Sequence, residues 1–269
     1  MALRLGLGLG LSGGVSFSPR SLFAASEPGF WYDPSDLTTL FQDAAGTTPV
    51  TAAGQSVGLM LDKSGRGNHA TQSTSLSRTT YQVDSNGRGH LLFDGSDDFL
   101  VTSASNYSVT DKAQVFAGVR KLSDAAQACV MAIGLNGGPP SANHEQGLLL
   151  APGASGASTY YWRVAGMFTG TQAIALGYSA PNTAVLSAQA DIAADLQRLG
   201  VNGSVVLGSG DLGTGSFGTA QVCYIGRRSG TSLPFSGRIY SLIARFGPNL
   251  TADQIAQTED WVNSKTGAY

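Results

Sequence analysis

Apolar and polar residues alternate in short runs along most of the chain, and residues that favour turns separate the runs. Alternation places apolar side chains on one face of an extended strand, so each run predicts a strand with one buried face. The strands expected on this basis span 114–121, 129–134, 147–150, 160–168, 183–191, 197–201, 205–207, 220–226 and 236–245. Residues 90–103 are expected to form two more, turning at Asp94-Gly95, and Asn202-Gly203 is a strong hairpin signal. Many short strands with little helix predict an all-β sandwich or jelly roll.

Two segments carry helical signals instead. Asp33 is followed by proline, which suits the first helical position, and we expect a short N-terminal helix over 34–41. Near the other end, Thr251 and Gln254 have the spacing of a capping box, and the apolar residues that follow recur with helical period. We therefore expect a C-terminal helix that packs on the sandwich.

Composition narrows the classes of partner. Only 13% of the residues are charged, the formal net charge is −2 and the pI is near 5.9. No broad basic field is available for phosphates, so we expect no nucleic-acid partner. No apolar run reaches the roughly 18 residues that a membrane-spanning helix needs. The two cysteines, Cys129 and Cys223, lie in apolar strand-like contexts, and the sequence leaves open whether they are buried thiols or a disulfide.

The first 25 residues differ from the rest, because leucine alternates there mainly with glycine. In an extended chain the leucines share one side, and glycine lets another backbone approach the other side. We interpret residues 1–25 as an extended arm that docks on a partner subunit, and residues 26–269 as one domain. A signal peptide and a disordered terminus are the alternatives. The residues expected to contact the partner are Leu3, Leu5, Leu7, Leu9 and Leu11.

The order of motifs in the body resembles a known fold family. DKSGRGNHA at 62–70 and LLFDGSDDFL at 91–100 resemble the entry of laminin-G-like, concanavalin-like jelly-roll domains. The hairpin LQRLGVNGSVVL, then CYIGRRSG, FSGRIYSLIAR and a final helix resemble the exit. The resemblance covers roughly residues 60–265 in order, and it implies a concanavalin/laminin-G-like sandwich.

A second resemblance concerns the stretch FWYDPSDLTTLFQDAAGTTPVTAAGQSVGLMLDKSGRGNHATQ at 30–72, whose first part, 30–60, is the entry segment of the domain. It resembles a segment of tailed-phage and prophage proteins that precedes such a jelly roll. This resemblance implies a structural or host-surface-binding role at the virion surface, in contact with other virion proteins and copies of the same chain. It implies no substrate.

Catalytic groups are sparse. Some concanavalin-like sandwiches are glycoside hydrolases, which need two carboxyl groups about 5–10 Å apart. The chain has three glutamates, which lie far apart in sequence: Glu27, Glu145 and Glu259. Its three histidines lack metal-ligand spacing: His69, His90 and His144. A G-x-G-x-x-G match at 208–213 is not followed by a helix. We therefore expect a non-enzymatic protein without a resident cofactor.

Calcium is the one metal that the sequence suggests. Laminin-G-like domains often hold Ca²⁺ on loops at one rim, and hard oxygen ligands at a turn suit that ion. The same acidic residues can instead satisfy backbone N–H groups of ordinary turns. The candidate ligands are Asp62, Asp94, Asp97 and Asp98.

Four consecutive residues are candidates for carbohydrate binding. By alternation, Tyr160 and Trp162 share one face of their strand, while Tyr161 and Arg163 share the other. One pair is expected in the core, and the other offers a stacking platform or an interface, unless both only frame the sandwich. Two functions remain on these grounds: a structural virion component docked through its arm, and a carbohydrate- or receptor-binding module on the virion or in a secreted lectin.

Overall fold

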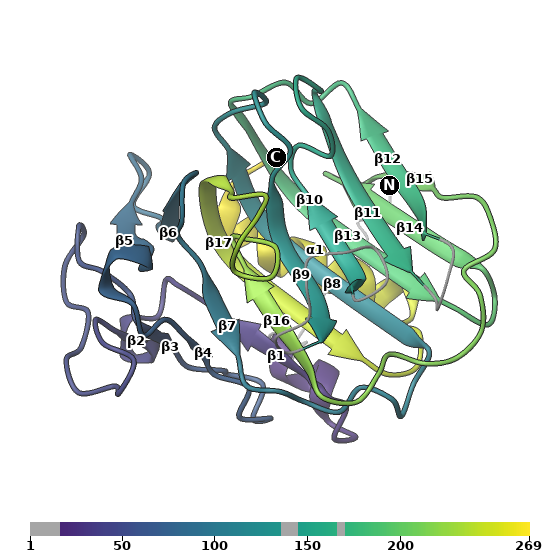
Figure 1. The fold of residues 1–269 in the computed structure, drawn as a ribbon, viewed down its shortest axis with the longest axis horizontal. Coiled ribbons are helices and arrows are strands. Elements are labelled where there is room, and N and C mark those ends of the chain that lie inside the picture. The colour runs from purple at the N-terminus through teal and green to yellow at the C-terminus, as the bar shows by residue number, and fades with distance from the viewer. Residues whose placement is uncertain (1–16, 136–144, 166–169) are drawn as a thin grey trace, which may run out of the picture.

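A computed structural model of the chain describes residues 17–135, 145–165 and 170–269. Two antiparallel sheets lie face to face, and one helix covers the back of one of them (Figure 1). The strands of the first sheet, sheet A, run in the order β15-β14-β13-β8-β17-β6-β5, with β1 also paired to β17. Their bounds are β1 Gly29–Tyr32, β5 Thr80–Val83, β6 Gly89–Asp94, β8 Lys112–Lys121, β13 Asn182–Asp191, β14 Leu196–Val201, β15 Ser204–Leu207 and β17 Ser236–Phe246.

Sheet B runs in the order β12-β11-β10-β9-β16-β7-β4-β3-β2. Its strands are β2 Leu40–Phe41, β3 Leu59–Met60, β4 Ala70–Thr71, β7 Leu100–Thr102, β9 Cys129–Leu135, β10 Glu145–Leu150, β11 Thr159–Ala165, β12 Gly170–Leu176 and β16 Gln221–Ile225. The described residues thus form the all-β jelly-roll sandwich that the alternation predicted.

The core lies between the sheets, and the middle of sheet A is covered on its other face as well. In β8, Val115 and Val119 face the core, whereas Phe116 faces the helix α1, Ala252–Thr266. Both faces of the middle of β8 are therefore buried, which explains the run without polar side chains from Val115 to Val119.

Helix α1 has the predicted start. The hydroxyl of Thr251 accepts from the N–H of Gln254, and the Gln254 side chain accepts from the N–H of Thr251. Ile255 and Val262 then pack on the outward face of sheet A, over β8, β13 and β17. Sheet B carries no helix on its outward face among the described residues, so its outward surface is the open side of the sandwich.

The helix expected over 34–41 is wrong. Only a 3₁₀ helix forms there, Leu37–Thr39, and the next two residues are β2. Its N-cap is Asp36, while the Asp33 carboxylate accepts from the hydroxyl of Ser35 and pairs with Lys63. The chain bends twice within eight residues because each aspartate closes its own turn.

The expected arm ends earlier than residue 25. Residues Pro19–Phe23 form a 3₁₀ helix, capped by Ser18, and Leu22 and Phe23 are buried in the cluster that joins sheet A to α1. Residues 18–23 are therefore part of the domain. The five leucines of the arm, Leu3 to Leu11, lie outside the described residues.

The hairpin at Asn202-Gly203 forms as predicted. Both residues adopt positive φ, +50° and +79°, as a tight two-residue turn between β14 and β15 requires. Another 3₁₀ helix spans Ser75–Ser77. In the described ranges no helix has the length and apolarity to cross a membrane.

Candidate functional site

The four-residue segment in β11 divides as alternation predicts. Tyr160 and Trp162 are wholly buried between the sheets. The Trp162 indole donates to the carbonyl of Gln189 over 3.0 Å, and the Tyr160 hydroxyl donates to Asn182 over 2.8 Å. Burial raises the pKa of Tyr160 far above its usual range. This pair frames the core and is not available to a ligand, so its assignment as a carbohydrate-binding pair is wrong.

Tyr161 and Arg163 point the other way, onto the outward face of sheet B, and both are partly exposed. Across the β11–β12 ladder, Tyr161 lies opposite Ile174 and Arg163 lies opposite Gln172. We call the surface of these four residues, Tyr161, Arg163, Gln172 and Ile174, the Tyr161 face.

The Tyr161 face continues over a small apolar cluster on the same side of sheet B. The buried members are Cys129, Ala132, Leu148 and Leu150, and Tyr161 packs against them from one side. The backbone of Gly153 lies on the Tyr161 ring so closely that an added Cβ would stand 2.0 Å from a ring carbon. The ring is thus held in place by the β10–β11 loop while part of it stays accessible.

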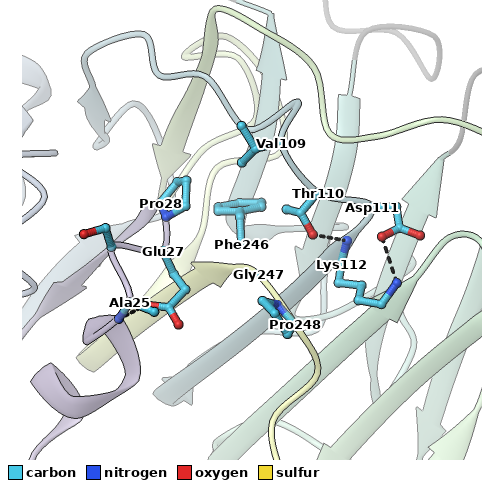
Figure 2. A pocket seen from close by; sticks show the side chains of 11 residues that line it. Ala25, Glu27, Pro28, Val109, Thr110, Asp111, Lys112, Phe246, Gly247 and Pro248 are labelled. Carbon is cyan, nitrogen blue, oxygen red and sulfur yellow. Dashed lines mark hydrogen bonds and ion pairs between the residues drawn. The ribbon is translucent and has the colours of Figure 1, made fainter.

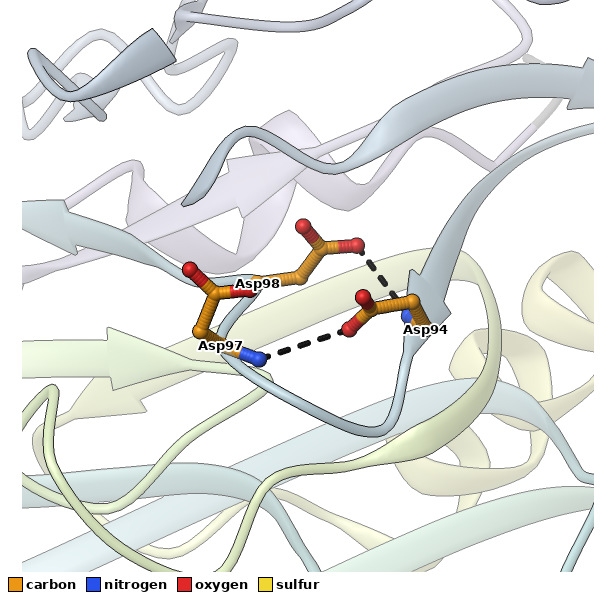
Figure 3. Close-up of side chains that lie close together, drawn as sticks. All are labelled: Asp94, Asp97 and Asp98. Carbon is orange, nitrogen blue, oxygen red and sulfur yellow. Dashed lines mark hydrogen bonds between the residues drawn. The ribbon is translucent and has the colours of Figure 1, made fainter. Parts of the chain in front are cut away.

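The acidic turn after β6 brings Asp94, Asp97 and Asp98 together (Figure 3), with one oxygen of each within 4.8 Å of the others. Asp98 accepts from the N–H of Asp94 over 3.1 Å, and Asp94 accepts from the N–H of Ser96 over 2.7 Å. A hollow of about 300 Å³ opens beside Asp94. These oxygens are hard ligands of the kind that Ca²⁺ uses, and the same oxygens also close the turn.

Asp98 is the buried carboxyl group of this turn. Burial, together with the charges of Asp94 and Asp97, raises the pKa of Asp98 to about 7. Repulsion makes three negative charges at this spacing energetically unfavourable, so the cluster of three carboxyl groups holds a proton or attracts a cation.

Asp62 does not join this group. Its carboxylate accepts from the N–H groups of Trp31, Ser64 and Asn68 at 2.9, 2.8 and 3.1 Å. These bonds fasten the turn after β3 to β1, which is a structural role. The structure therefore brings together three of the four candidate calcium ligands, and the fourth is wrong.

A pocket of about 450 Å³ that sequence reasoning missed lies at one end of sheet A (Figure 2). Phe246 and two prolines supply apolar surface, and Glu27 and Asp111 supply carboxylates. Arg245 pairs with Glu27 over 2.8 Å, and Lys112 pairs with Asp111 over 2.8 Å. The two acids are 84 residues apart in sequence (111 − 27), and no local motif joins them.

Both carboxyl groups of this pocket are stabilised as anions. The hydrogen bond from Lys112 lowers the pKa of Asp111. Burial acts to raise the pKa of Glu27, but hydrogen bonds from backbone N–H groups and from Arg245 outweigh it, and the pKa is lowered. A glycosidase needs one carboxyl group that stays protonated as general acid, and neither of these is suited to that role.

The cysteines, His69, His90 and Glu259, which the sequence analysis considered for chemistry, contribute to packing and hydrogen bonding in the fold. Cys129 lies in the outward cluster and Cys223 in the core, so the two thiols face opposite sides of sheet B and the disulfide alternative is wrong. The His69 ring accepts from the N–H of Asp62, and His90 is buried beside Tyr240. Glu259 accepts from the Ser187 hydroxyl under α1. His144 lies outside the described residues.

No protein-family model and no curated protein matches the sequence. Among solved structures, the binding domain of botulinum neurotoxin serotype G is similar, with 13% identity, a TM-score of 0.54, and coverage of 76% of this chain and 49% of that one. A structure of botulinum neurotoxin type C, a toxin whose cell entry is described as dependent on two ganglioside molecules, has 10% identity and a TM-score of 0.54, and the match covers 76% of this chain and 48% of that one. An arabinofuranosidase complexed with arabinofuranosyl-alpha-1,2-xylobiose has 12% identity and a TM-score of 0.55, and the match covers 93% of this chain and 65% of that one.

This chain therefore spans about half the length of the neurotoxin chains. At these identities the comparisons show the fold alone, a jelly-roll sandwich of the laminin-G/concanavalin-like kind.

Proposed function

We propose that the protein is a non-enzymatic binding module at the surface of a phage particle, and that it binds carbohydrate on a cell surface through the Tyr161 face. The observation that carries the proposal is the division of β11. Tyr160 and Trp162 hold the core, and the adjacent Tyr161 and Arg163 stand on the side of the sandwich that no described helix covers.

The chemistry of the Tyr161 face suits a sugar. The Tyr161 ring offers apolar area on which a pyranose can stack, and the planar guanidinium of Arg163 and amide of Gln172 offer hydrogen-bond donors on neighbouring positions. The β10–β11 loop fixes the ring in advance, which reduces the entropy lost on binding. Two of the similar structures are described with sugar ligands, ganglioside for the neurotoxin and arabinofuranosyl-alpha-1,2-xylobiose for the arabinofuranosidase, and they add support for a sugar ligand.

The absence of catalysis is part of the proposal. Its support is the environment of the acids: Glu27 and Asp111 are paired with cations, and Asp98 is engaged in its own turn.

The place on a phage particle rests on the resemblance of residues 30–72. In the fold this segment supplies β1, which pairs with the central strand β17, and β2 to β4 at the end of sheet B. The segment is thus integral to the sandwich. A second candidate role, a structural virion component docked through the arm, rests on the alternation of Leu3 to Leu11.

Glycan binding is tested on an array of bacterial surface polysaccharides, followed by calorimetry with the best ligand. We expect Tyr161→Ala and Arg163→Gln each to weaken binding at least tenfold. The matched controls are Tyr269→Ala and Arg20→Gln, which remove an exposed tyrosine and an exposed arginine elsewhere, and they should bind as wild type. Equal binding by all four variants would remove the Tyr161 face from the proposal.

Docking is tested by deleting residues 1–16, a cut that spares the buried Leu22 and Phe23. We expect the full chain to associate with itself or with purified particles, and the shortened chain to remain a folded monomer by light scattering and circular dichroism. Identical behaviour of the two chains would count against the arm.

A further inference from the structure

Two arginines lie directly opposite each other on the outward face of sheet A. In the register of β8 and β17, Arg120 pairs with Arg238, and the row continues to Thr183 on one side and Leu92 on the other. The row lies just beyond the end of α1, because Thr266 in the last helical turn stands over Gly118, two residues before Arg120. Both arginines are partly exposed.

This arrangement carries an uncompensated charge. Like charges directly opposite on neighbouring strands repel each other, and a guanidinium cannot shed its proton to relieve the repulsion. No carboxylate in the described ranges forms an ion pair with either arginine. Asp84, which lies on the same side, is already held by the hydroxyl of Tyr240 and by two backbone N–H groups.

The hydrogen bonding of the pair is also incomplete. Arg120 donates from Nη1 to the hydroxyl of Thr183 over 3.1 Å, and the Arg238 guanidinium lies beside the hydroxyl of Tyr240, whose pKa it acts to lower. The Nε–H groups of Arg120 and Arg238 are shielded from solvent, and neither has an acceptor within the described part of the molecule. Buried donors without acceptors cost stability, so these two Nε–H groups need an explanation.

We propose that Arg120 and Arg238 form an anion-binding site, which takes the oxyanion of an acidic sugar: the carboxylate of a uronic acid or the sulfate of a sulfated unit. An oxyanion between the two guanidinium groups neutralises both charges and supplies acceptors to their N–H donors in the forked geometry that arginine favours. The site lies on the sheet opposite to the Tyr161 face, so it is a second site of different specificity.

The test uses the full chain and small probes at constant ionic strength. Sulfate and glucuronate are titrated separately against chloride, and the Nε–H resonances of arginine are followed by NMR. We expect saturable shifts confined to Arg120 and Arg238. A tighter response to glucuronate identifies a carboxylate ligand, and a tighter response to sulfate identifies a sulfated one.

Arg120→Gln and Arg238→Gln should each weaken binding at least tenfold, whereas Arg20→Gln should leave it unchanged.

Thermal unfolding separates a ligand-binding role of the two arginines from a structural one. A site built for a ligand leaves the variants as stable as wild type or more stable without anion, because the repulsion is gone. The proposal is overturned if neither probe gives saturable shifts, or if the double variant still binds. Tyr161→Ala serves as the cross-control: it disables the Tyr161 face and should not alter sulfate binding, so the two proposals fail separately.

Discussion

Trp162 of sheet B donates its indole N–H to the backbone carbonyl of Gln189 in sheet A, across 3.0 Å of the core. In return the backbone carbonyl of Trp162 accepts from the side chain of Gln197 in β14 over 3.0 Å. One residue thereby connects two strands of the facing sheet to β11, the strand that presents Tyr161.

Replacing this side chain tests how far the core holds the site. Trp162→Phe removes the donor to Gln189 and leaves a cavity, so we expect the free energy of unfolding to fall by about 2–4 kcal/mol. Urea unfolding followed by circular dichroism measures it. Tyr161→Phe, one residue away on the outward face, should change stability by less than about 0.5 kcal/mol. Equal losses in the two variants would contradict the assignment of faces.

The titration of Asp98 predicts a pH dependence of stability. Its pKa of about 7 in the folded protein lies above the value of about 3.9 in an unfolded chain. Between these values the folded state keeps a proton that the unfolded state releases, so this group's contribution to stability falls as pH rises from about 4 to about 7. Asp98→Asn should remove this dependence and raise the melting temperature at about pH 8. A variant with an unchanged pH profile would show that Asp98 titrates normally.

Calcium should bind the same turn and counteract the loss of stability at high pH. We expect Ca²⁺ to raise the melting temperature at about pH 8, where the three carboxylates repel each other, and to do so less at about pH 5, where Asp98 holds a proton. Asp94→Asn and Asp97→Asn should abolish the effect, whereas Asp62→Asn should lower stability without changing the response to calcium. If Ca²⁺ changes the melting temperature at neither pH, these carboxylates serve only to close their own turn.

The hairpin between β14 and β15 offers a local test. Gly203 has φ of +79°, which an L-residue adopts only with strain, and no atom lies within 4 Å of an added Cβ. Gly203→Ala should therefore cost about 1 kcal/mol from the backbone alone. Chemical denaturation measures this cost, and Gly87→Ala, a turn glycine with φ of +78° and equally open space, is the matched comparison.

The sequence predicted the architecture well where strands alternate strongly or where a motif is local. β8, β13 and β17 lie where apolar residues recur, and the capping box of α1 needs only Thr251 and Gln254. β12 was missed because its core-facing residues are Ala173 and Ala175, which contrast little with their neighbours. The helix expected after Asp33 was wrong because the carboxylate closes a turn and contacts Lys63, a residue 30 positions later.

The candidate sites depended on contacts that alternation cannot supply. Period two separates Tyr160 from Tyr161, but which of them faces the core is decided by the register of β11 against β10 and β12. Asp62 accepts from three N–H groups that only the folded chain places around it, one of them from Trp31 in β1. Arg120 and Arg238 lie 118 residues apart (238 − 120), and only the pairing of β8 with β17 makes them neighbours.

The position of β17 has a consequence for how the chain is made. This strand is the last in sequence, yet it lies inside sheet A, bonded to β8 on one side and to β6 and β1 on the other. While a ribosome is still translating the preceding strands, β8, β6 and β1 present unpaired edges that invite association with other chains. Closure of the sheet must wait until Phe246 has emerged, so the nascent protein depends on fast completion or on a chaperone, and prematurely terminated products should be found in aggregates.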